Sequence, residues 1–166
     1  MKLQILLALL TLLTATNAWA APSRLLERAG SWNVMTYKSK HGKVCYFYAR
    51  PQTRSPAGLD HGDVSFFVSS SPKQGVLGEA NFVAGYEFRE GSVVGVDVDG
   101  ENFTMFTKND SAWLSGREQD RKLLHAMKKG RTMTVRAISA RGNPTRYTFA
   151  LSGVTKAAGD SRKACR

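Results

Sequence analysis

The feature that most constrains this chain is a period of two in its apolar residues, clearest in the middle of the sequence. In VVGVDVDG, Val94, Val96 and Val98 alternate with small or acidic residues. Successive side chains of a β-strand point to opposite faces, so this alternation predicts a strand with one buried face. Asp99-Gly100 then predicts a two-residue hairpin turn, because both central residues of such a turn need positive φ. The segment ENFTMFT supplies the returning strand.

Strand-like segments recur at close spacing along most of the chain. They are SWNVMTYKS (31–39), KVCYFYAR (43–50), DVSFFVSS (63–70), ANFVAGYEF (80–88), SAWL (111–114), RTMTVRAIS (131–139) and RYTFAL (146–151). Turn-forming residues separate them, and RPQTRSPAGLDHG (50–62) is expected to be a long loop. Many short strands of this kind predict a mainly β fold, an antiparallel β-sandwich or barrel-like single domain. Ile138 breaks the alternation of its strand, which indicates a bulge or a covered outer face.

One short helix is expected before the last hairpin. Ser115 and Glu118 fit a capping box, in which each side chain satisfies a free amide of the first helical turn. Leu123 and Met127 then form an apolar stripe, and Gly130 is a typical helix terminator. We expect this helix to lie on the sheet or to close one end of the sandwich. The tail after residue 151 shows only weak helical character.

The first twenty residues have the layout of a secretory signal peptide. Lys2 precedes the apolar run ILLALLTLL, and Ala18-Trp19-Ala20 forms an A-x-A cleavage pattern. The alternative is an uncleaved anchor, but the run is shorter than the roughly 20 residues that a membrane span needs. The sequence therefore predicts a signal peptide (1–20), a polar lead-in segment (21–30) and one β domain (31–166). The mature chain is expected to be periplasmic or secreted.

The charge of the chain is distributed very unevenly. Between residues 21 and 114 there are ten Lys or Arg against ten Asp or Glu, a net of zero. Between residues 115 and 166 there are thirteen against three, a net of +10. Such asymmetry indicates an anionic partner for the last third of the chain. The alternative is a solvated face that only keeps the protein soluble.

Six basic residues of this last third are the candidate anion-binding residues: Arg136, Arg141, Arg146, Lys122, Lys128 and Lys129. The arginines should cluster on the last hairpin, with the lysines on the helix before it. An anionic lipid, an acidic glycan, or an acidic protein of the envelope or the host fits such a surface, and peripheral contact with a membrane is compatible with it. Nucleic acid is not an expected partner, because the chain is exported and Tyr147 and Phe149 of the hairpin point inward.

The chain has two cysteines, Cys45 and Cys165. A catalytic Cys45 would need an oriented base and an exposed setting, but it shares a face with Phe47 and Ala49 and should point inward. A zinc site would need ligands at CxxC or HxxxH spacing, and the sequence has none. An exported chain with two cysteines favours one intramolecular disulfide, which would hold the tail against an early strand. Free thiols or an intermolecular bridge are the alternatives.

Other chemical signals are weak. Asp60, His61 and Asp63 form the one cluster that an envelope enzyme could use, but in a Gly/Pro-rich loop such residues more often shape turns. DVDGE (97–101) resembles part of a calcium loop, but Lys108 stands where the bidentate glutamate would be. We therefore expect a non-enzymatic protein with no cofactor and no metal site. A structural or assembly factor of the cell envelope is the second possibility.

The order of several segments resembles the invasion-associated locus B family. These segments are GDVSFFV, AGYEF, VDVDGENFTMFTKNDSAWL, AMKKGRTMTVRAISARGNPTRYTFALSGVTKA and the terminal AC. The resemblance extends from about Trp32 to Cys165. It implies an exported bacterial protein with a single β-rich domain, and the founding members of the family are associated with invasion of host cells. It brings no defined catalytic or binding residues.

Overall fold

The structure is a computed structural model that describes residues 22–166; the predicted signal peptide lies outside the described residues. The described part contains eleven strands, two helices and one short 3₁₀ turn. The strands are β1 (Arg24–Ala29), β2 (Trp32–Ser39), β3 (Gly42–Ala49), β4 (Thr53–Ser55), β5 (Ser65–Ser71), β6 (Val76–Val83), β7 (Val93–Val98), β8 (Glu101–Lys108), β9 (Ser111–Trp113), β10 (Thr132–Ile138) and β11 (Pro144–Ala150). The helices are α1 (Arg117–Lys129) and α2 (Val154–Ala164), and the 3₁₀ turn is η1 (Pro72–Gln74).

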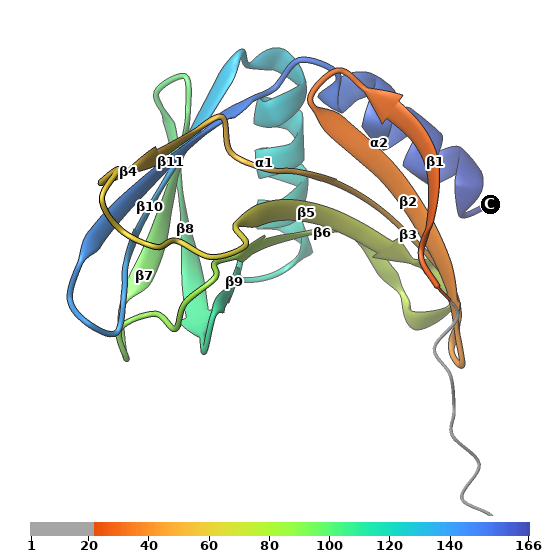
Figure 1. Ribbon diagram of the computed structural model, residues 1–166. Coiled ribbons are helices and arrows are strands. Elements are labelled where there is room, and N and C mark those ends of the chain that lie inside the picture. Colours follow the sequence, from red (N-terminus) through yellow and green to blue (C-terminus); the bar gives the residue numbers. More distant parts are fainter. Residues whose placement is uncertain (1–21) are drawn as a thin grey trace, which may run out of the picture.

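The strands form one antiparallel sheet in the order β1-β2-β3-β5-β6-β9-β8-β7-β10-β11-β4. Figure 1 shows this sheet bent into an arch, with β1–β3 on one side and β7, β10, β11 and β4 on the other. The inner faces of distant strands meet inside the arch. The rings of Phe66 on β5 and Phe149 on β11, for example, have centroids 6.0 Å apart.

The expected mainly β antiparallel fold is confirmed, but the prediction of a β-sandwich or barrel-like domain is only partly right. Within residues 22–166 the strands belong to a single sheet that stays open, with β1 and β4 as its edges. The three-residue strand β9 explains this continuity. It pairs with β6 through Phe82–Ala112 and with β8 through Thr107–Ala112, so it joins what would otherwise be two separate sheets.

The helix expected before the last hairpin is confirmed as α1, which packs along β6 and buries Leu123 and Met127. The predicted capping box is wrong. The N-cap residue is Gly116, which has a φ of 89° and no side chain to accept a hydrogen bond, so Ser115 lies outside the helix. The prediction of a single helix is also wrong, because the tail forms α2. Its stripe is short and built from small residues, with Val154 and Ala157 buried, so the sequence signal was weak.

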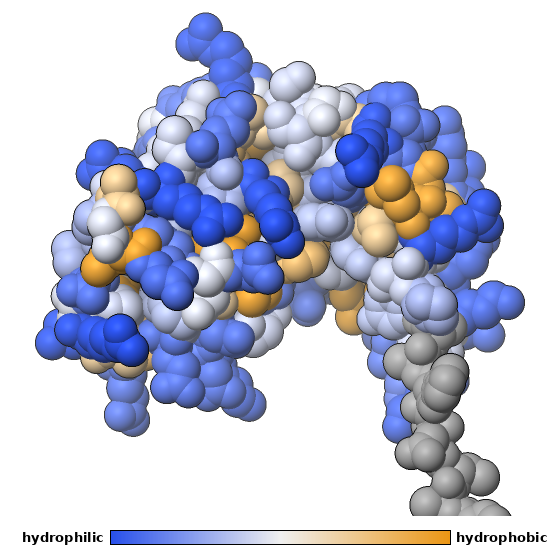
Figure 2. Space-filling model, in the orientation of Figure 1, coloured by the Kyte–Doolittle hydropathy of each residue, from blue (hydrophilic) through white to orange (hydrophobic). Residues whose placement is uncertain are grey.

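The segment expected as a polar lead-in is the edge strand β1, which pairs with β2 through Ala29–Trp32 and Arg24–Thr36. Its sequence RLLERA lacks a clean alternation because an edge strand can leave apolar side chains in water. Leu25 and Leu26 are exposed, and Figure 2 shows apolar surface over β1. The predicted long loop at 50–62 likewise contains the short edge strand β4, which pairs with β11.

The predicted disulfide between Cys45 and Cys165 is confirmed, with Cα atoms 5.8 Å apart. Cys45 is fully buried on the inner face of β3, beside Phe47 and Ala49, as its position in the alternation predicts. Because Cys165 follows α2 directly, the bond fastens that helix to the inner face of β3.

Gly153 allows α2 to begin close to the β1–β2 turn. Its φ is 95°, and a Cβ at this position would collide with the backbone carbonyl of Ala29.

No helix in residues 22–166 is both long enough and apolar enough to cross a membrane.

Candidate functional site

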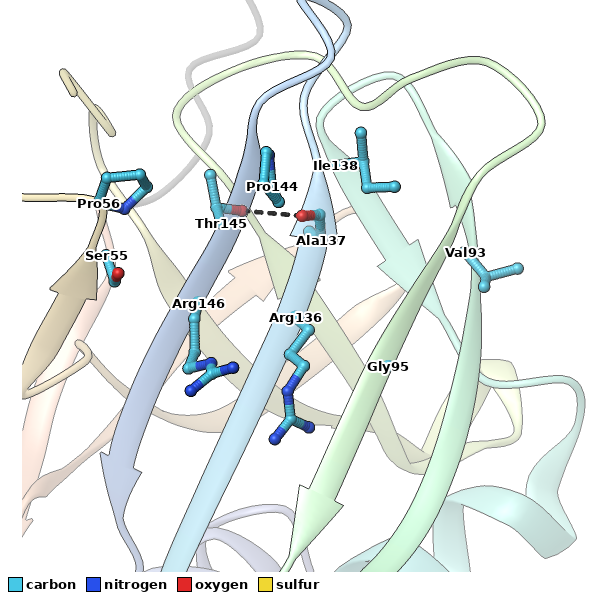
Figure 3. A pocket seen from close by; sticks show the side chains of 10 residues that line it. All are labelled: Ser55, Pro56, Val93, Gly95, Arg136, Ala137, Ile138, Pro144, Thr145 and Arg146. Atoms are coloured by element: carbon cyan, nitrogen blue, oxygen red, sulfur yellow. Dashed lines mark hydrogen bonds between the residues drawn. The ribbon is translucent and has the colours of Figure 1, made fainter.

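Two of the six predicted basic residues, Arg136 and Arg146, lie side by side on the outer face of the sheet. They are direct partners in the β10–β11 ladder, and both are exposed. The period of two explains their direction. Val135 and Tyr147 flank them in sequence and are fully buried, so the arginines must point away from the core. Figure 3 shows the two side chains projecting in parallel from neighbouring strands.

A hollow of about 590 Å³ lies beside these arginines. Arg136 pairs with Gly95 on β7 and Arg146 pairs with Ser55 on β4, so the arginines stand between two small residues. A Cβ placed on Gly95 would meet no atom within 4 Å, which leaves open space at that side. The apolar side chains of Pro56, Val93, Ile138 and Pro144 also line the hollow.

The hollow forms because β7 and β10 separate at one end. Their ladder covers Met133 to Arg136 and then stops. Beyond it, the segment at 87–89 occupies the edge of β10: Phe88 bridges Ser139, and the amide of Arg89 donates to the carbonyl of Ile138. Val93 and Ile138 are thereby held apart on either side of the opening. The pairing of β10 with β11 shows no register shift at Ile138, so there is no bulge at this residue. Ile138 breaks the apolar alternation because it is an apolar residue on the outer face of β10.

The two arginines make the hollow locally cationic, with the carboxylate of Asp97 in the next row of the same face of β7. Among the ion pairs found within residues 22–166, none includes Arg136 or Arg146. A guanidinium group presents its donors in a planar fork that fits a carboxylate, sulfate or phosphate. Two such groups on adjacent strands can hold one anion between them, with apolar walls beside it.

The remaining predicted basic residues lie elsewhere. Arg141 is in the β10–β11 turn, beside a second hollow of about 410 Å³ that Asp60, Tyr86 and Glu87 also line. The carboxylates there reduce the positive field around Arg141. Arg141 is therefore on the same hairpin as Arg136, as predicted, but at a different hollow.

The three lysines belong to α1, which covers the core side of the sheet. Lys122, Lys128 and Lys129 are exposed, and the Nζ of Lys122 lies 2.9 Å from a carboxylate oxygen of Glu118. This ion pair lowers the pKa of Glu118, first through the hydrogen bond and then through the charge of Lys122. Because α1 buries its apolar stripe against the inner face, its lysines do not share a surface with Arg136. The predicted basic face is thus divided between separate surfaces.

The loop with Asp60, His61 and Asp63 does not gather these side chains into one site. Asp60 accepts a hydrogen bond from the amide of Gly62 (2.9 Å), which shapes the turn. Asp63 is exposed and forms an ion pair with Arg50 (3.3 Å). His61 instead points into the core.

His61 is one end of a buried polar network. Its Nδ1 lies 2.8 Å from the hydroxyl of Tyr147, and its Nε2 lies 2.8 Å from the carbonyl oxygen of Pro56. The hydroxyl of Tyr147 donates to that of Tyr86 (2.9 Å), which lies 2.6 Å from the hydroxyl of Thr145. Burial, followed by the contact with Tyr86, raises the pKa of Tyr147 well above its ordinary range. The network joins the loop to β11.

The residues of the calcium-like segment serve the hairpin. Asp99 and Gly100 have φ values of 47° and 100°, so the predicted turn is confirmed. The carboxylate of Asp99 accepts hydrogen bonds from the amides of Arg131 (2.7 Å) and Thr132 (3.2 Å), at the start of β10. In the described part of the chain no group of three or more His, Cys, Asp or Glu side chains is arranged to hold a metal ion.

The chain is similar to one protein family and to one solved structure. The family model described as "Invasion associated locus B (IalB) protein" matches residues 32–161. The crystal structure of invasion associated protein B from Bartonella henselae is similar, with a TM-score of 0.60 and 13% sequence identity; the match covers 85% of this chain and 98% of that chain. At this identity the likeness supports the fold alone. No curated protein matches the chain.

Proposed function

The chain belongs to the invasion-associated locus B family, and from that premise we propose that it is an exported protein that acts by binding and not by catalysis. Its partner is anionic, and the site is the outer face around Arg136 and Arg146. The family description connects its members with invasion. A role in contact with host cells is therefore part of the proposal.

Export is supported by two independent features. The sequence predicts a cleavable signal peptide at residues 1–20. The disulfide between Cys45 and Cys165 is of the kind that forms and persists in oxidising compartments such as the periplasm. Together they favour a mature protein of the periplasm or the extracellular space.

The observation that carries the binding proposal is the placement of Arg136 opposite Arg146. Like charges directly opposite each other in a sheet are unfavourable. This pair nevertheless lies beside an open hollow, with no ion pair to either residue in the described part of the chain. A bound anion would relieve the repulsion and use both guanidinium forks.

Charge reversal tests this proposal. Arg136→Glu with Arg146→Glu should weaken binding to an acidic polysaccharide such as heparin by about tenfold or more. The matched control is Lys128→Glu with Lys129→Glu, which makes the same change of net charge on α1. Binding in the parent should also weaken with added salt. An equal loss in both double variants would show a general charge effect, and a parent that binds no anion would refute the site.

A structural or assembly role in the envelope is the second candidate. It is favoured by the edge strand β1, where Leu25 and Leu26 are exposed at the border of the sheet. An edge strand with apolar side chains can receive a strand of another protein. Crosslinking in intact cells would separate the two candidates. This candidate predicts capture of one envelope protein through β1, and the anion-binding proposal predicts capture that depends on Arg136 and Arg146.

A further inference from the structure

An apolar strip lies on the same outer face, one step along the strands from the arginine pair. Val93 on β7 and Phe106 on β8 are partners in the ladder, and their side chains are 55% and 49% exposed. Phe106 is also the ladder partner of Trp113 on β9, and the two rings have centroids 6.0 Å apart. The strip thus crosses three strands with large side chains that the protein leaves in contact with water.

The strip and the arginines form one continuous surface. Val93 is two residues from Gly95, the ladder partner of Arg136, so the rows are separated by roughly 7 Å along the strand. Ile138 and Pro144 extend the apolar row across β10 and β11, where Figure 3 shows them at one end of the hollow.

The chemistry of this surface selects among anionic partners. A soluble acidic polysaccharide would use the guanidinium groups but would leave Val93 and Phe106 in water. The interface of a bilayer offers both parts, because lipid phosphates lie directly above the first acyl carbons. Tryptophan is also favoured at that depth, since its ring is apolar and its N–H is polar.

We propose that the outer face of β7–β11 docks on an anionic phospholipid bilayer. Arg136 and Arg146 bind lipid phosphates, and Phe106 and Val93 enter the interface beside Trp113. This inference rests on the proposed anion-binding function and names its partner. Asp97, on the same face of β7, lies on the far side of Gly95 from Val93, and its carboxylate accepts a hydrogen bond from the amide of Gly100 in the hairpin turn (3.4 Å).

The chain carries its own reporter of this docking. Trp32 is fully buried, whereas Trp113 is half-buried on the proposed surface. Protein recovered after export, with its N-terminus determined, is mixed with vesicles of phosphatidylcholine with or without phosphatidylglycerol. Trp113 fluorescence should shift to the blue only with the anionic vesicles, and a Trp113→Phe variant should lose the shift.

Two sets of variants separate the two proposals. Phe106→Ser with Val93→Ser should weaken vesicle binding by roughly tenfold and leave heparin binding unchanged. Arg136→Glu with Arg146→Glu should weaken both. Leu77→Ser removes a side chain that is 59% exposed on β6 and is the matched control, expected to change neither. Circular dichroism and urea unfolding check that each variant is folded.

Each outcome is decisive. If heparin binding depends on the arginines but vesicle binding is absent or unaffected by Phe106→Ser with Val93→Ser, bilayer docking is refuted and the anion-binding function stands. If the arginine variant changes neither ligand, both proposals fail. Equal binding to neutral and anionic vesicles would also refute the docking proposal, because the arginines would then have no role.

Discussion

Arg136 and Arg146 face each other directly across the β10–β11 ladder, two like charges on one face of the sheet. Their neighbours in the next row are Thr134 and Thr148, which suit a strand exposed to water. The arginine pair is therefore the unfavourable choice for stability at this position, and binding is the reason we infer for it.

Arg146→Thr should stabilise the fold by about 0.2–1 kcal/mol, because it removes a repulsion between directly opposed side chains. Urea unfolding at low salt measures this change, and the gain should shrink as salt is added. Arg141→Thr, in the turn and without an arginine opposite, is the control and should stay within experimental error. A clear loss of stability in Arg146→Thr would show that the arginine contributes to folding.

The disulfide between Cys45 and Cys165 should be a major source of stability. Its two residues are separated by 120 positions, so removing it by Cys45→Ala with Cys165→Ala should cost roughly 4–5 kcal/mol on the chain-entropy model. Reduction of the parent protein should give a similar loss in guanidinium unfolding. Thiol labelling provides the check: two labelled cysteines in native exported protein would contradict the bond.

Asp120 should make stability depend on pH. Its carboxylate accepts a hydrogen bond from the buried amide of Ala80 (3.0 Å), and burial raises its pKa above the ordinary 3.8 despite that bond. The folded chain therefore holds the proton more tightly than the unfolded chain. The contribution of Asp120 is most favourable below its ordinary pKa and declines as the pH rises through the raised folded pKa. The pKa of Glu79 is raised too, first by burial and then by Asp120, so its contribution has the same sign.

Asp120→Asn keeps an oxygen that can accept from Ala80 and removes the charge. The stability of this variant relative to the parent should therefore increase between about pH 3 and pH 7. Asp120→Ala leaves the amide of Ala80 without a partner and should cost about 1–3 kcal/mol at low pH, with a smaller cost as the pH rises because the variant also removes the buried charge. A difference between Asp120→Asn and the parent that is the same at all pH values would contradict the raised pKa.

His61 should act as a structural residue. His61→Ala removes the partner of Tyr147 and of the carbonyl of Pro56, and we expect a loss of about 1–3 kcal/mol because buried polar groups are left unsatisfied. Asp63→Ala breaks only an exposed ion pair and should change stability by less than about 0.5 kcal/mol. Thermal unfolding compares the two. If His61→Ala left stability unchanged, the histidine would be free for a chemical role.

Local chemistry made several parts of the fold predictable. The Asp99-Gly100 turn, the strands on either side of it and the buried face of β3 all follow from turn preferences and the period of two. The edge strands β1 and β4 could not be found in this way, because they bury few side chains and their pattern resembles that of a loop. Helix α2 was not predicted for a related reason. Its buried face carries small residues such as Ala157, so the two faces of the helix differ little in hydrophobicity.

The candidate site was only partly predictable. The alternation placed Arg136 and Arg146 outward, and the broken alternation at Ile138 pointed to the same face. The exposed strip with Val93 and Phe106 gave no such signal, because a period of two does not tell which face of a strand meets water when both carry apolar residues.

The sequence by itself determined a mainly β chain, the direction of each side chain in its clear strands, and the two cysteines available for one bond. Only the tertiary structure decided that the strands form one open sheet. It also decided that the cationic residues divide between separate surfaces, and that the arginine pair lies beside an apolar strip. The physical reason is that periodicity fixes the face of a strand, whereas its neighbours depend on pairing between distant segments. Arg136 and Phe106 share a surface because β10 pairs with β7 and β7 with β8.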